Sequence, residues 1–170
     1  MSDPTRSLVI TCSDRAAQGL RRDESGPAVK RFLEARGFDV AEVLVVADEI
    51  DEIARMIEAA IDEDDFRFIV TTGGTGLARR DVTPDATNRI AHKHIPGFGE
   101  LMRARSLEHT PKAPLSRAQA VTRGSALVIN LPGSTAGAVE NLEAVIHLVP
   151  HALGLLGEEI EHLEHTESER

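Results

Sequence analysis

The sequence contains no tyrosine, no tryptophan and one cysteine, and its only aromatic side chains are five phenylalanines. Stacking platforms for single-stranded nucleic acid are therefore largely missing, and we expect no nucleic-acid partner. The lone thiol, Cys12, excludes an internal disulfide and a cysteine-based zinc site, and we interpret it as a packed core group. We find no secretion signal and no apolar run long enough to span a membrane, which predicts a cytoplasmic protein without a membrane partner.

Two familiar nucleotide-binding motifs are also absent. The sequence has no Gly-x-Gly-x-x-Gly stretch, and none of its lysines follows a glycine as a Walker A motif requires. A phosphate ligand would therefore have to be bound by backbone amides, arginines and hydroxyls, or through a metal ion.

The formal charge of −9 over 170 residues is unevenly distributed. Residues 48–65 hold nine acids and one base, and residues 158–170 hold six acids and one base. Residues 79–123 hold nine bases and four acids. We interpret the acidic segments as a solvated helix and tail. The basic stretch is compatible with small phosphorylated substrates but not with a long polyanion.

The apolar residues alternate between short continuous runs and helical spacing. Strands are predicted at 8–11, 40–46, 66–72 and 127–131, with helices around 29–36, 50–61, 83–94, 97–107, 139–146 and 153–163. Residues 109–125 contain two prolines and a glycine, and we predict that they are mostly loop. The alternation predicts one α/β domain over residues 1–170, with its core at about 7–163. Its central, mostly parallel sheet would be covered by helices on both faces, as a three-layer α/β/α sandwich.

Ligands of open α/β sheets bind beyond the carboxyl ends of the strands. Here each predicted strand ends in small or polar residues, at 11–15, 47–49, 73–76 and 132–134. Glycine-rich turns expose backbone N–H groups that bind anions. Any one of these turns could simply be tight, but four along one sheet edge favour a ligand cleft.

Asp48 and Asp81 are the carboxylates that stand out at this edge. Together with phosphate oxygens they would suit Mg²⁺, although Asp48 could instead cap the helix that begins near Ile50. Thr83 is the predicted cap of the following helix, which leaves Asp81 available for another role. Arg79, Arg80 and Arg117 could bind phosphate or could be solvated surface residues.

With these loops placed, the sequence resembles the MogA/MoaB family of molybdenum cofactor biosynthesis, and within it the molybdopterin adenylyltransferases. The resemblance covers about residues 7–155. The stretch Thr71–Thr87 is its most specific part, and five further motifs accompany it in the same order, at 11–15, 23–27, 95–103, 115–118 and 129–134.

The resemblance implies a homotrimer that transfers AMP from Mg-ATP to the terminal phosphate of molybdopterin, releases pyrophosphate and passes its product to a molybdenum-insertion protein. It also implies residue roles. Asp48 and Asp81 would be the catalytic, Mg²⁺-associated residues. The nucleotide phosphates would be bound by Ser13, Asp14, Gly73, Gly74, Thr75 and Gly76, and molybdopterin by Ser116, Arg117, Pro132, Gly133 and Ser134.

One position departs from the family pattern. Many members carry a lysine two or three residues past the Pro-Gly turn, where this chain has Thr135, Ala136 and Gly137. A non-catalytic molybdopterin-binding or scaffold protein of the same fold is therefore an alternative.

Overall fold

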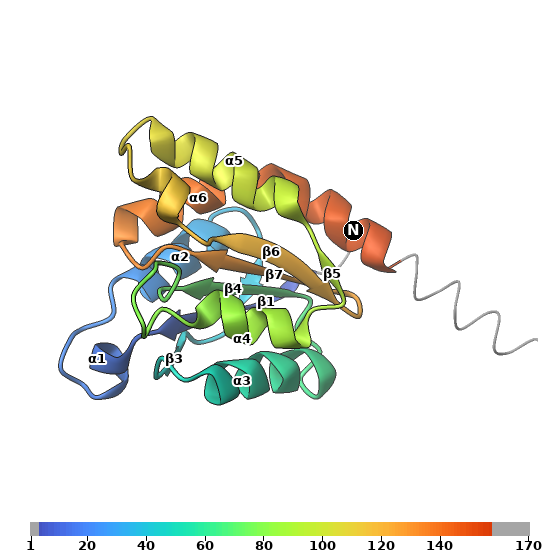
Figure 1. Ribbon diagram of the computed structural model, residues 1–170. Helices are drawn as coiled ribbons and strands as arrows, with labels where there is room; N and C mark the ends of the chain where they lie inside the picture. Colours follow the sequence, from blue (N-terminus) through green and yellow to red (C-terminus); the bar gives the residue numbers. More distant parts are fainter. Residues whose placement is uncertain (1–3, 158–170) are drawn as a thin grey trace, which may run out of the picture.

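The computed structural model describes residues 4–157, and its centre is a seven-stranded sheet (Figure 1). The sheet order is β2-β1-β4-β7-β6-β5, and β3 also pairs with β1. Strands β1, β2, β3, β4 and β7 are parallel, whereas β6 is antiparallel to both of its neighbours. The strands are β1 (Arg6–Cys12), β2 (Asp39–Val40), β3 (Leu44–Val46), β4 (Phe68–Thr72), β5 (Lys93–His94), β6 (Gln119–Arg123) and β7 (Ala126–Leu131).

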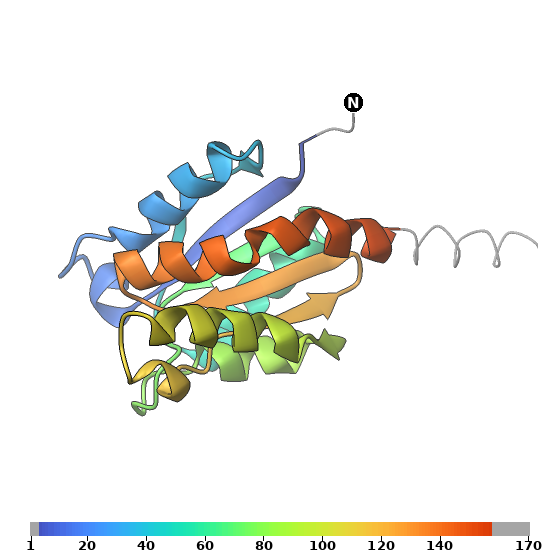
Figure 2. The same ribbon diagram turned by 90° about the horizontal axis from the view of Figure 1, so that it is seen from above.

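Helices cover both faces of the sheet, so the predicted three-layer fold is confirmed. Helices α2, α5 and α6 lie on one face, which Figure 2 views from above, and α3 and α4 lie on the other (Figure 1). Residues 149–157 continue the chain as a further helical segment. The elements are α1 (Asp14–Ala17), α2 (Ser25–Glu34), α3 (Ile50–Asp62), α4 (Thr83–Ile90), α5 (Pro96–Leu107) and α6 (Thr135–Val145), with 3-10 turns η1 (Ala113–Leu115) and η2 (Ile146–Leu148).

The continuous apolar runs form strands that are buried on both faces. In β4, Phe68 and Val70 contribute to the core beneath α2, α5 and α6, whereas Ile69 packs with Ile53 and Ile57 of α3. Each fully buried side chain of this size stabilises the fold by about 1.5–3 kcal/mol. The two cores therefore fix the sheet between its helical layers.

The prediction that residues 109–125 are mostly loop was wrong for residues 119–123. Gln119–Arg123 form β6, which reaches β7 through a tight turn at Gly124, where φ is +51°. Lys93–His94 form the edge strand β5 and are not helical, so the predicted helix from 83 ends at Ile90. Helices cover β6 as well, which explains why Ala120 and Val121 are buried.

Several boundaries also differ from the prediction. The predicted strand 40–46 is two short strands, β2 and β3. Thr83 is the first residue of α4 and does not cap it, and the cap position of α3 is occupied by Glu49 and not by Asp48. The buried Leu153 confirms the predicted helix near the end of the core, while the predicted helical residues 158–163 and the acidic segment 158–170 lie outside the described residues.

The register brings the predicted site loops to one edge. Thr11 of β1 is paired with Thr72 of β4, and Thr72 is paired with Leu131 of β7. Cys12 is paired with Val46 of β3. Because these strands are parallel, the loops that follow all four emerge at the same end of the sheet. Within residues 4–157, no helix is long and apolar enough to cross a membrane.

Candidate active site

The glycine loop after β4 passes very close to its neighbours. Gly73 and Gly74 have φ values of +92° and +67°, which favour glycine. A Cβ on Gly73 would lie 2.3 Å from the carbonyl oxygen of Cys12, and one on Gly74 would lie 2.2 Å from the hydroxyl of Thr83. The absence of side chains lets this loop fit between the end of β1 and the start of α4.

Asp14 and Asp48 hold the ends of β1 and β3 together through reciprocal hydrogen bonds. The backbone N–H of Asp14 donates to Asp48 Oδ2 at 2.9 Å, and the backbone N–H of Asp48 donates to Asp14 Oδ1 at 3.0 Å. The remaining oxygen, Asp48 Oδ1, is buried and has no hydrogen-bond partner within residues 4–157. A Cβ on Gly74 would lie 3.3 Å from it, so this oxygen faces the glycine loop. The carboxylate is therefore available to a cation or a donor at that loop.

The two carboxyl groups differ in their electrostatic environments. Burial raises the pKa of Asp48, and the charges of Asp14 and Asp81 raise it further, against the opposing effects of the Asp14 N–H and of Arg80. Hydrogen bonds from Arg80 lower the pKa of Asp14, and the backbone N–H of Asp48 contributes to the same effect. Asp48 is thus the carboxylate whose negative charge is less well compensated. A bound cation would compensate it.

Arg80 binds carboxylates of the neighbouring loops. Its guanidinium donates to both carboxylate oxygens of Asp14 and to Glu49, each at 2.9 Å. These contacts tie the segment after the glycine loop to the ends of β1 and β3. Arg79 is exposed, and within residues 4–157 it makes no ion pair. That Arg79 or Arg80 binds phosphate stays a prediction.

Asp81 closes the loop that follows the glycines. Its Oδ2 accepts the backbone N–H of Ala78 at 2.9 Å, and a Cβ on Gly76 would lie 2.7 Å from the same oxygen. Asp81 is half-buried, and its charge contributes to the raised pKa of Asp48. The two predicted catalytic carboxylates therefore both lie against the glycine loop, Asp48 at Gly74 and Asp81 at Gly76.

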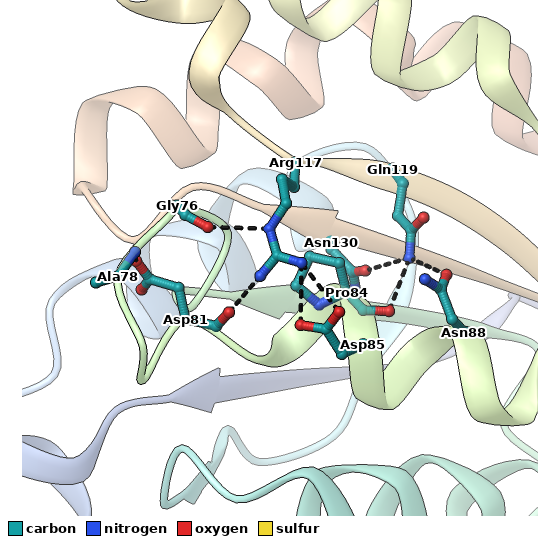
Figure 3. Close-up of polar contacts among 9 residues, drawn as sticks. All are labelled: Gly76, Ala78, Asp81, Pro84, Asp85, Asn88, Arg117, Gln119 and Asn130. Carbon is teal, nitrogen blue, oxygen red and sulfur yellow. Dashed lines mark hydrogen bonds and ion pairs between the residues drawn. The ribbon is translucent and has the colours of Figure 1, made fainter.

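Arg117 braces this loop (Figure 3). Its Nε donates to the carbonyl oxygen of Gly76 at 3.0 Å, and another nitrogen donates to the carbonyl oxygen of Asp81. The third nitrogen lies 3.0 Å from each carboxylate oxygen of Asp85. The prediction that Arg117 binds molybdopterin stays untested, but its guanidinium already has a bracing role in the protein.

A buried amide network anchors α4 to the sheet, and sequence reasoning missed it. Asn130 of β7 donates to the hydroxyls of Thr71 and Thr87 at 3.0 Å each. Its Oδ1 accepts from the side-chain amide of Gln119 at 3.3 Å, as Figure 3 shows. The available signal was an asparagine inside the otherwise apolar run 126–131. This network fixes the helix that follows Asp81.

Two pockets flank the glycine loop. The first, of about 300 Å³, has a polar wall with two arginines, and the second, of about 570 Å³, lies among the loop at 75–77, η1, α5 and α6. A Cβ on Gly133 would lie 3.2 Å from the Cα of Gly73, so these two glycines meet in the lining of the first pocket, and Ser134 borders both pockets. Of the predicted site residues, the first pocket is lined by Ser13, Gly73, Gly133 and Ser134, and the second by Thr75, Gly76, Ser116, Pro132 and Ser134.

The donor set at this edge fits a magnesium ion shared with phosphate. Within residues 4–157, no group of three or more His, Cys, Asp or Glu side chains is arranged to hold a metal ion. Mg²⁺ keeps several waters and often takes only one or two carboxylates plus phosphate oxygens. The unpartnered oxygen of Asp48, with Asp81 nearby, meets that requirement.

The comparisons with known proteins show the family of this chain. Residues 8–151 match the family described as "Probable molybdopterin binding domain". The chain belongs to this family. It is 43% identical over 150 residues to the molybdopterin adenylyltransferase of Helicobacter pylori, which covers 87% of this chain and 85% of the relative. It is 42% identical over 140 residues to that of Escherichia coli, covering 81% of this chain and 71% of the relative.

A solved structure extends the family match to the fold. The molybdopterin biosynthesis enzyme MoaB of Thermus thermophilus matches with a TM-score of 0.84 and 43% identity, covering 89% of this chain and 96% of that one. The resemblance to the MogA/MoaB family that the motifs indicated is therefore confirmed.

Proposed function

We propose that this protein is a molybdopterin adenylyltransferase. In the reaction, a terminal phosphate oxygen of molybdopterin attacks the α-phosphorus of ATP, and the bond from that phosphorus to the departing pyrophosphate breaks. The observation that carries the proposal is the buried oxygen of Asp48, which has no hydrogen-bond partner among the described residues and faces Gly74. Asp48 lines neither pocket, but the loop that its oxygen faces lines both, the smaller one through Gly73 and the larger one through Thr75 and Gly76. This arrangement occurs in a chain 43% identical to a relative with this name.

The two pockets suit the two substrates. We assign the nucleotide to the smaller pocket, where Ser13, Arg21 and Arg22 line a polar wall beside Gly73. We assign molybdopterin to the larger pocket, which offers apolar contact from Leu77 and Leu115 and can enclose a bicyclic ring. Each substrate would then extend a phosphate toward Ser134, which borders both pockets.

The protein's contribution to this reaction is electrostatic and positional. The nucleophile is already a phosphate anion, so no strong general base is needed, and the obstacle is the repulsion between two anions. Asp48 and Asp81 would hold Mg²⁺ with water and phosphate oxygens, and the ion when bound supplies positive charge at the triphosphate. The backbone amides of residues 73–76 would add donors, and Arg117 keeps their loop in place.

One observation favours a non-catalytic pterin-binding or scaffold protein. The segment 135–137 lacks the lysine that many family members carry, and the hydroxyl of Ser134 already accepts the N–H of Gly137 at 3.2 Å. A scaffold would bind molybdopterin and consume no ATP. It would not need Asp48 and Asp81, which is why we prefer the enzyme.

The deciding experiment incubates the protein with molybdopterin, ATP and Mg²⁺ and measures pyrophosphate and adenylylated pterin. We expect both products, and we expect Asp81→Asn to abolish them with little change in melting temperature. Absence of product from folded protein, with the pterin shown to be intact, would refute the proposal. Pterin binding by calorimetry without ATP consumption would support the scaffold, and pterin-independent ATP loss would indicate a hydrolase.

The proposal includes a homotrimer in the cytoplasm that passes its product to a molybdenum-insertion protein. The family resemblance is the support for this assembly. Light scattering that gives the mass of three copies would agree with it, and a monomeric mass would refute it.

A further inference from the structure

The hydroxyl groups of the larger pocket are already hydrogen-bond acceptors. Ser106 accepts from the side-chain amide of Asn141 at 2.8 Å, and Ser116 accepts from the backbone N–H of Ala118 at 3.2 Å. Each hydroxyl therefore keeps its O–H as a donor. Ser116 and Ser134 lie on the pocket wall that also includes Gly76, where donors would suit phosphate oxygens.

Glu140 gives the same pocket a different character on the α6 side. Among the described residues that line the pocket, it is the only carboxylate. Its side chain is 34% exposed, and its ion-pair contact is with His109 Nε2 at 3.8 Å, which is too long for a hydrogen bond. His109 itself is 50% exposed. Glu140 therefore presents an acceptor-only group whose two oxygens are available to a ligand.

The pyrimidine edge of a pterin is complementary to such a group. Its 2-amino group and N3–H are adjacent, nearly parallel donors, and a carboxylate can accept both at once in a bidentate, charge-assisted pair. On the basis of the proposed function, we propose that Glu140 binds this edge and makes the pocket specific for pterins over analogues that lack the 2-amino group. We name Glu140 as the specificity-determining residue of the pterin pocket.

The charge of Glu140 also determines the orientation of molybdopterin in the pocket. A carboxylate repels the phosphate of molybdopterin, whereas the hydroxyls of Ser116 and Ser134 attract it. The pterin ring is then directed toward α6, and the phosphate toward Gly76, whose position lies against Asp81. The same residue thus selects the ring and directs the nucleophile to the catalytic edge.

The test uses the monophosphate of 6-hydroxymethylpterin and its lumazine counterpart, in which oxygen replaces the 2-amino group. We expect the wild type to bind the pterin at least about 10-fold more tightly by calorimetry, because the lumazine leaves the carboxylate facing an acceptor. Glu140→Gln should bring this ratio close to one and raise the KM for molybdopterin about 10- to 100-fold. Glu140→Ala should behave likewise, and circular dichroism checks that both variants fold.

Two variants of neighbouring residues control for structural effects. Glu143→Gln alters an exposed carboxylate on the same helix and should keep the wild-type ratio. His109→Gln removes the ion pair with Glu140 and should also keep it. Retention of the ratio by Glu140→Gln, or its loss in His109→Gln, would overturn the inference. Binding is measured without turnover, so a wild type that discriminates but forms no adenylylated product would contradict the proposed function alone.

Discussion

Replacing Asp48 by asparagine should stabilise the protein and abolish adenylyl transfer. Asp48 Oδ1 is buried with no hydrogen-bond partner, and an unsatisfied buried group of this kind costs about 1–3 kcal/mol, with more for a charge. Asparagine removes the charge, and its carbonyl oxygen can still accept the N–H of Asp14. We expect the free energy of unfolding to rise by about 1 kcal/mol at pH 8. For a protein of this size, that raises Tm by about 2–4 °C.

The gain should depend on pH in a defined direction. Burial raises the pKa of Asp48 in the folded state, so the wild type is destabilised as pH rises from the unfolded value of about 4 through the folded one. The advantage of Asp48→Asn should therefore grow across that window and stay constant above it. Asp62 provides the opposite control, because a hydrogen bond from Arg123 lowers its pKa. Asp62→Asn should destabilise at pH 7 by less than about 1 kcal/mol, and this loss should vanish as pH falls below about 4.

The measurements are urea denaturation and thermal melting of both variants in buffer without added metal ions, with pyrophosphate release as the activity assay. Adding Mg-ATP should stabilise the wild type and not Asp48→Asn, since ligand binding to the folded state raises its stability. A Tm of Asp48→Asn more than 2 °C below that of the wild type would refute the argument from the unpartnered oxygen. Normal turnover by this variant would remove Asp48 from the reaction.

Three further substitutions test the loops around the site. Arg80→Gln should leave the midpoint of urea unfolding nearly unchanged, because its ion pairs are exposed, yet lower kcat/KM by loosening the loop. A large loss of stability with normal turnover would contradict this. Gly74→Ala should lower the free energy of unfolding by at least about 2 kcal/mol, because Gly74 has a positive φ and a Cβ there would contact the Thr83 hydroxyl. Gly97→Ala is the control, since a Cβ at Gly97 meets open space and should not destabilise the protein. Equal melting temperatures for the two variants would count against the close approach at Gly74. Lysine cannot reproduce the contacts of Arg117 with Gly76, Asp81 and Asp85, so trypsin should cleave the 76–85 loop faster in Arg117→Lys than in the wild type. Unchanged cleavage would show that these contacts do not hold the loop.

The fold could be predicted wherever burial imposes a simple pattern. The strands β1, β4 and β7 are buried on both faces and appear as continuous apolar runs, and α3 shows a clear apolar stripe. Strand β6 gave no such signal, because it has polar residues at both ends, Gln119 and Arg123, and follows a segment broken by Pro111 and Pro114. Strand β6 pairs with β7 through the turn at Gly124, and the closeness of the two segments in the sequence does not by itself show that they form a hairpin.

The location of the site was more predictable than its internal contacts. Loops after parallel strands must meet at one edge, so Asp48 and the glycines could be placed together from the sequence. The hydrogen bonds between Asp14 and Asp48, by contrast, depend on the register of β1 against β3. The partners of Arg80 and Arg117 depend on how one loop folds back on the sheet. Long side chains reach many positions, and spacing in the sequence does not determine which one they occupy.

The contact between Gly73 and Gly133 has a kinetic consequence. Both glycines line the smaller pocket, and Ser134, next to Gly133, lines both pockets. The proposed product would pass this contact, with its nucleotide half in the smaller pocket and its pterin half in the larger one. Once one half is bound, the second binds intramolecularly, which can strengthen binding by about 10²–10⁴-fold over a single half. The product would therefore dissociate slowly, and its departure would limit repeated turnover. A downstream protein that takes the product directly from this surface would relieve that limit.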